Sequence, residues 1–360
     1  MRRRHEGTKA RRHEVFAVIV ITLFSVNVQA TEERFVEVLP DPQEMARIEA
    51  AVDEGLEYLA KHQKADGSWP TSIHGGNGSN NGVNAVCVLA FLGRGHAPNR
   101  GPYKQVVSNA VKYILSTQNN EGLFYSTARS HGVMYEHGLA TLAMIEAYGF
   151  IPSIEMRKKV QKAVDVIVKA QNQQGGWRYS ARPHDADLSV TVMQVVPLRA
   201  ALNARLNVPE KTIKNAAKYV KMCAFKSGGF GYQPHNHPSM AQSAAGALSM
   251  QLLGEYDDPS VDKALKYLQK HQFNKRATSH FYYTTYYSMQ AHFQKGGAAW
   301  ANWYPQVKKV LLETQEEDGS WPAFHSHERM ANDKNAHCFT TAMAAMSLEV
   351  FMHYLPAYQK

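Results

Sequence analysis

The chain has little of what marks a disulfide-stabilised, multidomain or nucleic-acid-binding protein. Its 360 residues include only three cysteines, Cys87, Cys223 and Cys338, which allow at most one internal disulfide. No Pro/Gly/Ser-rich linker or low-complexity tract divides the chain, which argues against separate domains joined by a linker. No run of Lys and Arg follows the first thirty residues, so nucleic acid is not an expected partner.

Several common catalytic signatures are also missing from the sequence. It contains no Ser-His-Asp order, no Gly-rich loop of the kind that cradles phosphates, and no Asp-rich diphosphate motif. The sequence therefore predicts no cofactor.

Residues 1–30 have the composition of an export signal. Six Lys or Arg side chains precede an apolar run of about fourteen residues, 15–28. The run ends in Val28-Gln29-Ala30, which has the small-x-small pattern of a signal-peptidase site. A bilayer span needs ~20 apolar residues, which disfavours an uncleaved anchor. We predict a periplasmic or secreted protein, cleaved after about Ala30, whose formal charge falls on cleavage from +9 to +5.

The rest of the chain repeats one phrase, a helical stretch that ends in glutamine and is followed by a glycine and an aromatic residue. Four clear copies occupy residues 58–69 (YLAKHQKADGSW), 113–124 (YILSTQNNEGLF), 166–177 (VIVKAQNQQGGW) and 310–321 (VLLETQEEDGSW), and weaker copies occupy 219–230 and 267–281. Successive copies are 43 to 55 residues apart, which is enough for two helices and two loops. We predict six helical hairpins.

Each hairpin pairs an amphipathic helix with an almost wholly apolar one. Asp41 and Pro42 predict a capped helix start, and apolar residues then recur at helical spacing, whereas residues 83–92 are apolar on every side. This asymmetry predicts a closed double ring in which the apolar helices are enclosed. We interpret the repeated Gln, Gly and Trp as structural residues, because repetition indicates a role performed in every hairpin.

The repeated Gln-x-x-x-Gly-x-Trp phrase resembles the QW-type repeat of terpene cyclases and protein prenyltransferase beta subunits. Residues 135–149 (YEHGLATLAMIEAYG) and 282–297 (YYTTYYSMQAHFQKGG) resemble more closely the exported bacterial prenyltransferase/squalene oxidase repeat proteins. The resemblance implies an all-α fold, an alpha/alpha toroid over residues 44–354, with a lead-in at 31–43 and a tail at 355–360. It does not select a chemistry, because one fold hosts many functions.

The sharpest candidate for chemistry is the segment from His184 to Thr191 (HDADLSVT) in the third repeat. Class II terpene cyclases carry Asp-x-Asp-Asp at this place, and the resemblance implies Asp187 as the proton donor, tuned by Asp185 and His184. The family's last aspartate is Leu188 here, so the match is incomplete. The alternative is that Asp185 or Asp187 only caps the following helix.

Aromatic and polar residues are expected around a central cavity, where aromatic rings would stabilise carbocations. Alternatively, these aromatic residues only pack in the core and line no binding site. The predicted cavity-lining residues are Tyr135, Glu136, His137, Trp177, Tyr179, Phe281, Tyr282 and Tyr286.

A metal site is a further candidate. His337, Cys338 and Asp333 suit a metal by residue type. The resemblance to prenyltransferase beta subunits implies an Asp-x-Cys pair, which this chain lacks. We therefore predict no metal.

Three functions remain open from the sequence. The first is an exported isoprenoid cyclase of class II type acting on an apolar small molecule, although full-length triterpene cyclases build their cavity between two such barrels. The second is a non-catalytic exported toroid that binds a lipid, glycan or protein. The third is a protein prenyltransferase beta-like subunit.

Overall fold

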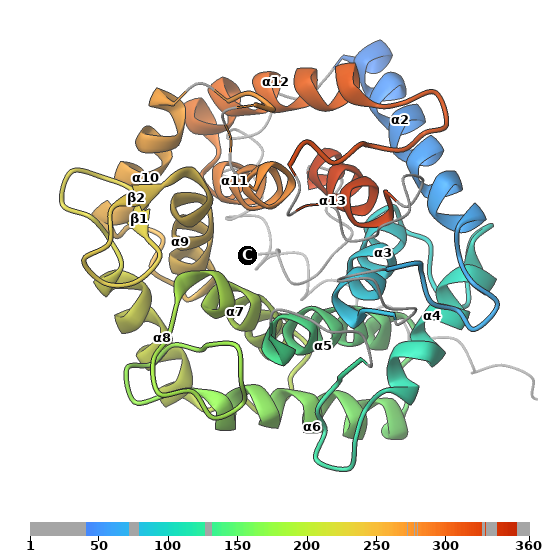
Figure 1. Ribbon diagram of the computed structural model, residues 1–360, viewed down its shortest axis with the longest axis horizontal. Coiled ribbons are helices and arrows are strands. Elements are labelled where there is room, and N and C mark those ends of the chain that lie inside the picture. Colours follow the sequence, from blue (N-terminus) through green and yellow to red (C-terminus); the bar gives the residue numbers. More distant parts are fainter. Residues whose placement is uncertain are drawn as a thin grey trace, which may run out of the picture.

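The computed structural model describes residues 41–71, 79–126, 132–271, 273–276, 278, 280–325, 328 and 337–350. These residues form two concentric rings of helices, which confirms the predicted alpha/alpha toroid (Figure 1). The outer helices are α2 (Pro42–Lys61), α4 (Lys104–Ser116), α6 (Ile154–Ala170), α8 (Glu210–Met222), α10 (Pro259–Lys270) and α12 (Gly297–Thr314). The inner helices are α3 (Asn81–Gly93), α5 (Val133–Phe150), α7 (Leu188–Asn203), α9 (Met240–Leu252), α11 (Phe281–Lys295) and α13 (Cys338–Leu348).

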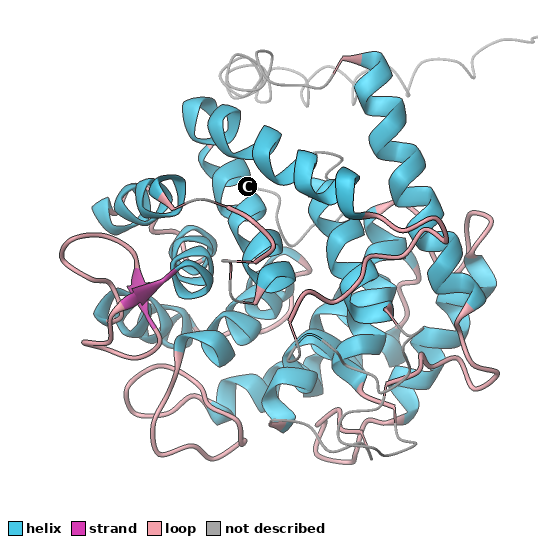
Figure 2. Cartoon of the chain, turned by 45° about the horizontal axis from the view of Figure 1, so that its top comes forward, coloured by secondary structure: helices cyan, strands magenta, loops and turns pink. Residues whose placement is uncertain are grey.

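The two rings differ in burial as their sequences predict. Every residue of α3 is buried, whereas α4 buries only Val107, Ala110, Val111 and Ile114. The described residues contain one sheet of two short antiparallel strands, β1 (Phe230–Gly231) and β2 (Pro238–Ser239), each two residues long. Figure 2 shows this sheet at the edge of the molecule. No helix in the described part of the chain is long and apolar enough to cross a membrane.

The ring is closed, as predicted. Each inner helix contacts the next one in the sequence, and α13 contacts α3 (Figure 1). The outer ring closes at the same seam, where Lys308 of α12 forms an ion pair with Glu44 of α2. Asp41 caps α2 as expected, because its carboxylate accepts the backbone N–H groups of Gln43 and Glu44 at 2.9 Å each.

One glutamine per hairpin joins that hairpin to the next. The Nε2 atom of Gln63 donates to the carbonyl of Gly67 at 3.0 Å and to the carbonyl of Val106, in α4, at 2.9 Å. Gln118, Gln171 and Gln315 repeat this arrangement, reaching the carbonyls of Lys159, Thr212 and Ala51 respectively. The last of these bonds crosses the seam from the sixth hairpin back to the first.

The glycine and the tryptophan complete this junction. Gly319 has φ +85°, and a Cβ atom there would lie 2.5 Å from the carbonyl oxygen of Glu54 in α2, so no side chain fits. The buried indole of Trp321 donates to the carbonyl of Leu311 at 2.8 Å. Trp69 and Trp177 make the same bond in their hairpins. The structural interpretation of the repeated residues is thus confirmed.

The weaker copies depart from this pattern in different ways. In the fourth hairpin Ala224 replaces the glutamine, and the β1–β2 pair lies in the loop that follows. In the fifth hairpin Gln272 lies outside the described residues.

The seam glutamine gives a direct test of this junction. We expect Gln315→Ala to lower the free energy of unfolding by about 1–3 kcal/mol, since two partly buried hydrogen bonds are lost. Urea denaturation followed by circular dichroism measures the change. Glu317→Ala, an exposed change in the same loop, serves as the control and should leave stability unaltered. Equal stability of the two variants would contradict the proposed role of Gln315.

Candidate functional site

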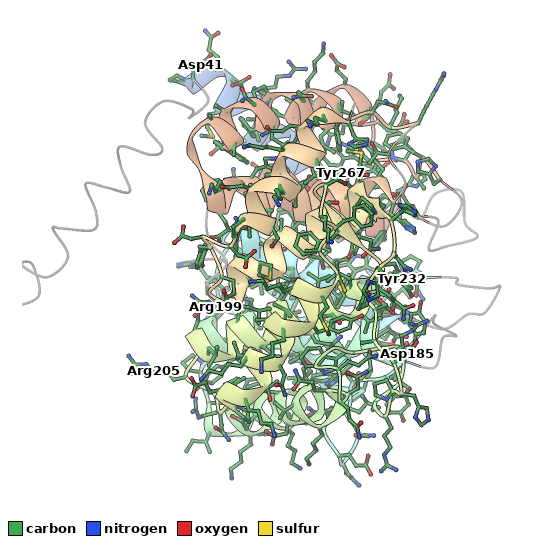
Figure 3. The ribbon with its side chains drawn as sticks, turned by 90° about the vertical axis from the view of Figure 1, so that its left-hand side faces the viewer. Asp41, Asp185, Arg199, Arg205, Tyr232 and Tyr267 are labelled. Atoms are coloured by element: carbon green, nitrogen blue, oxygen red, sulfur yellow. The ribbon has the colours of Figure 1, made fainter. Side chains whose placement is uncertain are left out.

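All six inner helices follow the loop that carries the Gly-aromatic phrase, so their N-termini lie at one mouth of the ring. In Figure 3, Asp185 and Tyr232 lie at this mouth, while Arg199 and Arg205 lie at the opposite side. Helix N-termini carry unpaired N–H groups and a positive partial charge. Carboxylates at this mouth are therefore in a favourable electrostatic position.

Asp187 is the fully buried N-cap of α7. Its Oδ1 atom accepts the backbone N–H of Val190 at 2.8 Å. Asn80 and Ser239 occupy the same position before α3 and α9 and cap those helices in the same way. Helix capping by Asp187 is therefore observed, and it accounts for one of the two carboxylate oxygens.

The second oxygen of Asp187 faces Arg178. The Nε atom of Arg178 lies 3.3 Å from Oδ2 of Asp187, and its Nη1 atom lies 2.8 Å from Oδ2 of Asp185. The guanidinium also lies over two aromatic rings, 4.8 Å from the ring centre of Tyr179 and 5.6 Å from that of Tyr232. The hydroxyls of these two tyrosines are 2.5 Å apart. An arginine held by two carboxylates and two rings is thus the electrostatic centre of the mouth.

Burial and the arginine act on Asp187 in opposite directions. Burial raises the pKa of the Asp187 carboxyl, because it disfavours the charged form, and the hydrogen bonds from Val190 and Tyr232 and the charge of Arg178 partly offset the increase. The net shift is upward, which is the direction a proton donor requires.

The residues predicted to assist Asp187 are both more exposed than Asp187 itself. Asp185 has a half-exposed side chain that contacts Arg178, and His184 is exposed. Sequence reasoning missed Arg178 and Tyr232. Arg178 had a signal, because it follows Trp177 at a place where the other described hairpins carry Pro70, Tyr125, Gly231 and Pro322.

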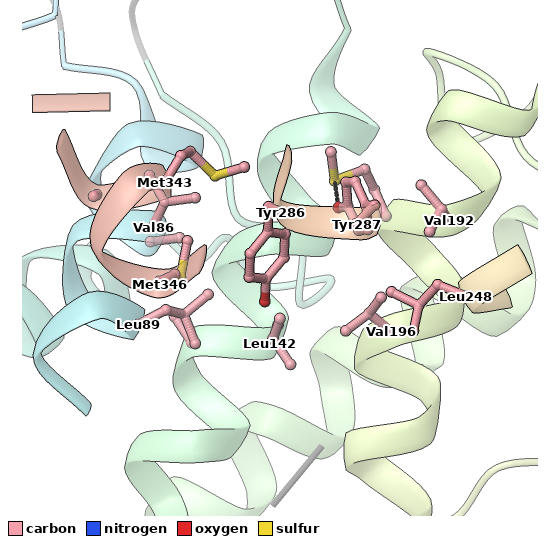
Figure 4. Close-up of a cluster of buried hydrophobic side chains, with 14 of the residues drawn as sticks. Val86, Leu89, Leu142, Val192, Val196, Leu248, Tyr286, Tyr287, Met343 and Met346 are labelled. Carbon is pink, nitrogen blue, oxygen red and sulfur yellow. Dashed lines mark hydrogen bonds between the residues drawn. The ribbon is translucent and has the colours of Figure 1, made fainter. Parts of the chain in front are cut away.

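The centre of the inner ring contains a small apolar cavity of about 30 Å³. Such a space holds only about one or two water molecules. Figure 4 shows the side chain of Tyr286 extending into this centre, between Met343, Met346 and Leu142. Five of the six inner helices line the cavity, through Val86, Leu89, Gly138, Leu139, Leu142, Met193, Val196, Pro197, Tyr283, Tyr286, Tyr287, Phe339, Met343 and Met346.

Of the predicted cavity-lining residues, Tyr286 lines this cavity. Tyr135 and Tyr179 pack on each other near the mouth, with ring centres 5.9 Å apart. Trp177 faces its own outer helix, where it donates to the carbonyl of Ile167. Phe281 and Tyr282 pack against Phe324, and the hydroxyl of Tyr282 donates to the carbonyl of Pro322 at 2.7 Å. Trp177, Phe281 and Tyr282 therefore belong to the contacts between hairpins and loops.

His137 and Glu136 also have structural partners. His137 accepts the backbone N–H of Phe124 at 3.1 Å and bonds the carbonyl of Ala163 at 3.0 Å, and burial lowers its pKa to about 4. Thr191 and Thr341 receive the equivalent N–H in their hairpins. A histidine in this repeated position acts as a neutral acceptor and joins the Gly-aromatic loop to the outer ring.

Glu136 stabilises the start of a neighbouring helix. Its Oε2 atom accepts the backbone N–H of Asn81, the first residue of α3, at 3.3 Å, and it also accepts the hydroxyl of Ser126. Glu136 lies one residue before His137, and His137 takes the repeat position of Thr191. The buried carboxylate of Glu136 therefore lies about one helical turn after the position that corresponds to Asp187.

The candidate metal ligands do not gather in the described part of the chain. No group of three His, Cys, Asp or Glu side chains in this part is arranged to hold a metal ion. His337 precedes α13, where its backbone N–H donates to the hydroxyl of Tyr58. Cys338 is buried, and burial raises the pKa of its thiol to about 12. Asp333 lies outside the described residues.

Comparison with known families agrees with this architecture. The family model of the prenyltransferase alpha-alpha toroid domain matches residues 17–178 and 153–280, and the chain belongs to this family. A drimenyl diphosphate synthase of Streptomyces showdoensis is 27% identical over 138 residues, which are 38% of this chain and 24% of that enzyme. The chain thus spans about a quarter of the length of that curated relative.

Solved structures of the same fold include enzymes with different chemistries. A variant of the type II terpene cyclase MstE from Scytonema, in complex with merosterolic acid A, superposes with a TM-score of 0.63 and 16% identity, over 88% of this chain and all of that chain. Cellobiose 2-epimerase from Bacillus thermoamylovorans superposes with a TM-score of 0.60 and 12% identity, over 82% of this chain and 97% of that chain. These likenesses show the fold, and the site must select the function.

The pH dependence of stability tests whether burial or the charge of Arg178 has the larger effect on the pKa of Asp187. A folded pKa raised above the ordinary 3.8 means that Asp187 contributes most stability when protonated and loses this contribution as pH rises through the folded pKa. The stability of the wild type relative to Asp187→Asn should therefore increase as pH falls from neutrality toward 3.8. Urea denaturation of both proteins across this pH range measures the difference. The opposite slope would show that Arg178 outweighs burial.

Proposed function

We propose that the protein binds an apolar chain of isoprenoid type at the centre of its inner ring. The observation that carries this proposal is the cavity itself, which five inner helices line almost entirely with aliphatic, methionine and aromatic side chains. Apolar walls with few polar groups are typical of sites for apolar ligands. The structural neighbours add support, since a variant of MstE has been solved in complex with its substrate, geranylgeranyl dihydroxybenzoate.

Binding requires the cavity to enlarge. At about 30 Å³ it is too small for a prenyl chain, and Tyr286 occupies the space that a ligand needs (Figure 4). Met193, Met343 and Met346 surround it. Methionine side chains are unbranched and change shape easily, so the walls are of the kind that adapts to a ligand.

Removal of the Tyr286 side chain tests this proposal. We expect Tyr286→Ala to bind farnesol and geranylgeraniol roughly tenfold more tightly than the wild type, because no ring must be displaced, a gain of about 1.4 kcal/mol. Titration calorimetry measures the affinities. Tyr125→Ala removes an exposed tyrosine and serves as the control. Identical affinities in the two variants, or no binding in either, would contradict a site at the ring centre.

A second candidate is proton-initiated cyclisation, in which Asp187 is the general acid. The raised pKa of its buried carboxyl favours this function. A single toroid is not an obstacle, since this chain matches the whole of the solved MstE chain. Two features favour binding over cyclisation: Asp187 is not among the residues that line the cavity, and its two oxygens already face Val190 and Arg178.

Product analysis separates these two functions. Squalene and shorter polyprenes are incubated with the wild type and with Asp187→Asn, and the extracts are compared by gas chromatography and mass spectrometry. Binding without catalysis predicts unchanged polyprenes in both samples. A cyclised product that appears only with the wild type would establish Asp187 as the acid and replace our first proposal.

A glycan or protein ligand and a prenyltransferase role have less support. No observation on the described residues specifies a glycan or a protein as the ligand. The missing Asp-x-Cys pair argues against a prenyltransferase beta-like subunit.

We also propose that the protein is exported. The basic head, the short apolar run and the Val28-Gln29-Ala30 site support this localisation. Mass spectrometry of the protein from the periplasmic and secreted fractions should find an N-terminus at about Thr31. Recovery of the chain only with residues 1–30 attached would contradict cleavage.

A further inference from the structure

Three inner helices bring polar side chains together at the edge of the apolar cavity. Ser189 of α7, Gln242 of α9 and Tyr283 of α11 meet where the cavity approaches the mouth. Tyr283 lines the cavity, and Ser189 lies beside its hydroxyl. The Nε2 atom of Gln242 donates to the hydroxyl of Ser189 at 2.8 Å. Ser189 therefore lies between the other two side chains.

Two polar atoms of this group have unused hydrogen-bonding capacity. The Oε1 atom of Gln242 is buried and accepts no hydrogen bond from the part of the chain that the structure describes. The hydroxyl of Tyr283 is also buried; Ser189 faces its oxygen as a donor, outside ordinary hydrogen-bond geometry, so the hydrogen of Tyr283 has no acceptor among the described residues. Leaving a buried polar atom unpaired costs about 1–3 kcal/mol, so such atoms are rare without a ligand or water. One of the two is a hydrogen-bond donor and the other is an acceptor only.

The neighbouring tyrosine shows the contrast. Tyr287 lies one turn along the same helix, and its ring packs on that of Tyr283 with centres 4.6 Å apart. Its hydroxyl is paired, since it donates to the sulfur of Met193 at 3.1 Å (Figure 4). The hydroxyl hydrogen of Tyr287 thus has an acceptor, whereas that of Tyr283 has none at ordinary hydrogen-bond geometry among the described residues.

From this arrangement we propose that the ligand is an isoprenoid alcohol, with its hydroxyl at Ser189 and its chain in the cavity. The alcohol oxygen accepts the hydroxyl hydrogen of Tyr283, and the alcohol hydrogen is donated to Oε1 of Gln242. Gln242 also lines an open groove of about 440 Å³ at the mouth, with Tyr232, His237 and His280. The alcohol end thus lies toward the groove and the apolar end toward Tyr286. This inference rests on the proposed function, because it assumes that the ring centre binds an apolar chain.

The experiment compares three ligands that share one chain: geranylgeraniol, its methyl ether and the corresponding hydrocarbon. The alcohol both accepts and donates, the ether only accepts, and the hydrocarbon does neither. We expect affinity to fall in this order, by about three- to tenfold for each hydrogen bond lost. In Tyr283→Phe the ether should bind no better than the hydrocarbon, and hydrocarbon affinity should be unchanged. This variant removes a buried hydroxyl that makes no hydrogen bond of ordinary geometry, so it should fold normally.

Tyr282→Phe is the matched control, because it removes a buried tyrosine hydroxyl that bonds the carbonyl of Pro322 outside the cavity, and it should retain the wild-type order of affinities. Equal binding of alcohol and hydrocarbon by the wild type would overturn the alcohol assignment and leave the apolar site intact. An unchanged preference for the alcohol in Tyr283→Phe would likewise overturn it. Failure of all three ligands to bind would overturn the proposed function together with this inference.

Discussion

The side-chain amide of a glutamine at the end of the outer helix is the interaction on which the toroid depends. In four hairpins this amide donates one hydrogen bond to its own loop and another to the next outer helix. The first bond fixes the loop that contains the glycine and the aromatic residue, and the second fixes the angle between hairpins. Because Gln315 makes the same pair of bonds to Gly319 and Ala51, the seam is built like the other junctions. A ring follows from a local rule applied repeatedly.

This repetition also determines what the mouth can contain. Each junction directs an inner helix to begin at the same side of the ring, so a side chain that caps the helix faces the mouth. Asn80, Asp187 and Ser239 all cap an inner helix, but of these three only Asp187 carries a charge. The third hairpin, which contains Asp187, is also the one in which an arginine follows the aromatic residue of the loop. The ionic site is therefore a variation on one structural position. This origin explains how Asp187 serves both as a cap and as a buried carboxyl with a raised pKa.

Most of the fold was predictable from sequence, and much of the site was not. The Gln-Gly-Trp phrase and the apolar second helix predict six hairpins and a closed ring, because hydrogen bonding and burial at each junction are local. The cavity depends on side-chain volume. Tyr286 fills the ring centre, whereas Trp177, Phe281 and Tyr282 pack between hairpins, and residue type alone does not distinguish these positions. His137 was predicted to line the cavity, yet its repeat position is taken elsewhere by Thr191 and Thr341. Aligning the repeats position by position would have found both this structural role and Arg178.

The most direct test of ring closure is a zero-length cross-link across the seam. Carbodiimide treatment of the monomeric protein, followed by digestion and mass spectrometry, joins a lysine and a carboxylate that form an ion pair. A closed ring predicts an intramolecular link between Glu44 of α2 and Lys308 of α12, the first and last outer helices. If this link is absent, while the pair Lys214 and Glu210 within α8 is joined under the same conditions, the ring is open and this account of the fold is wrong.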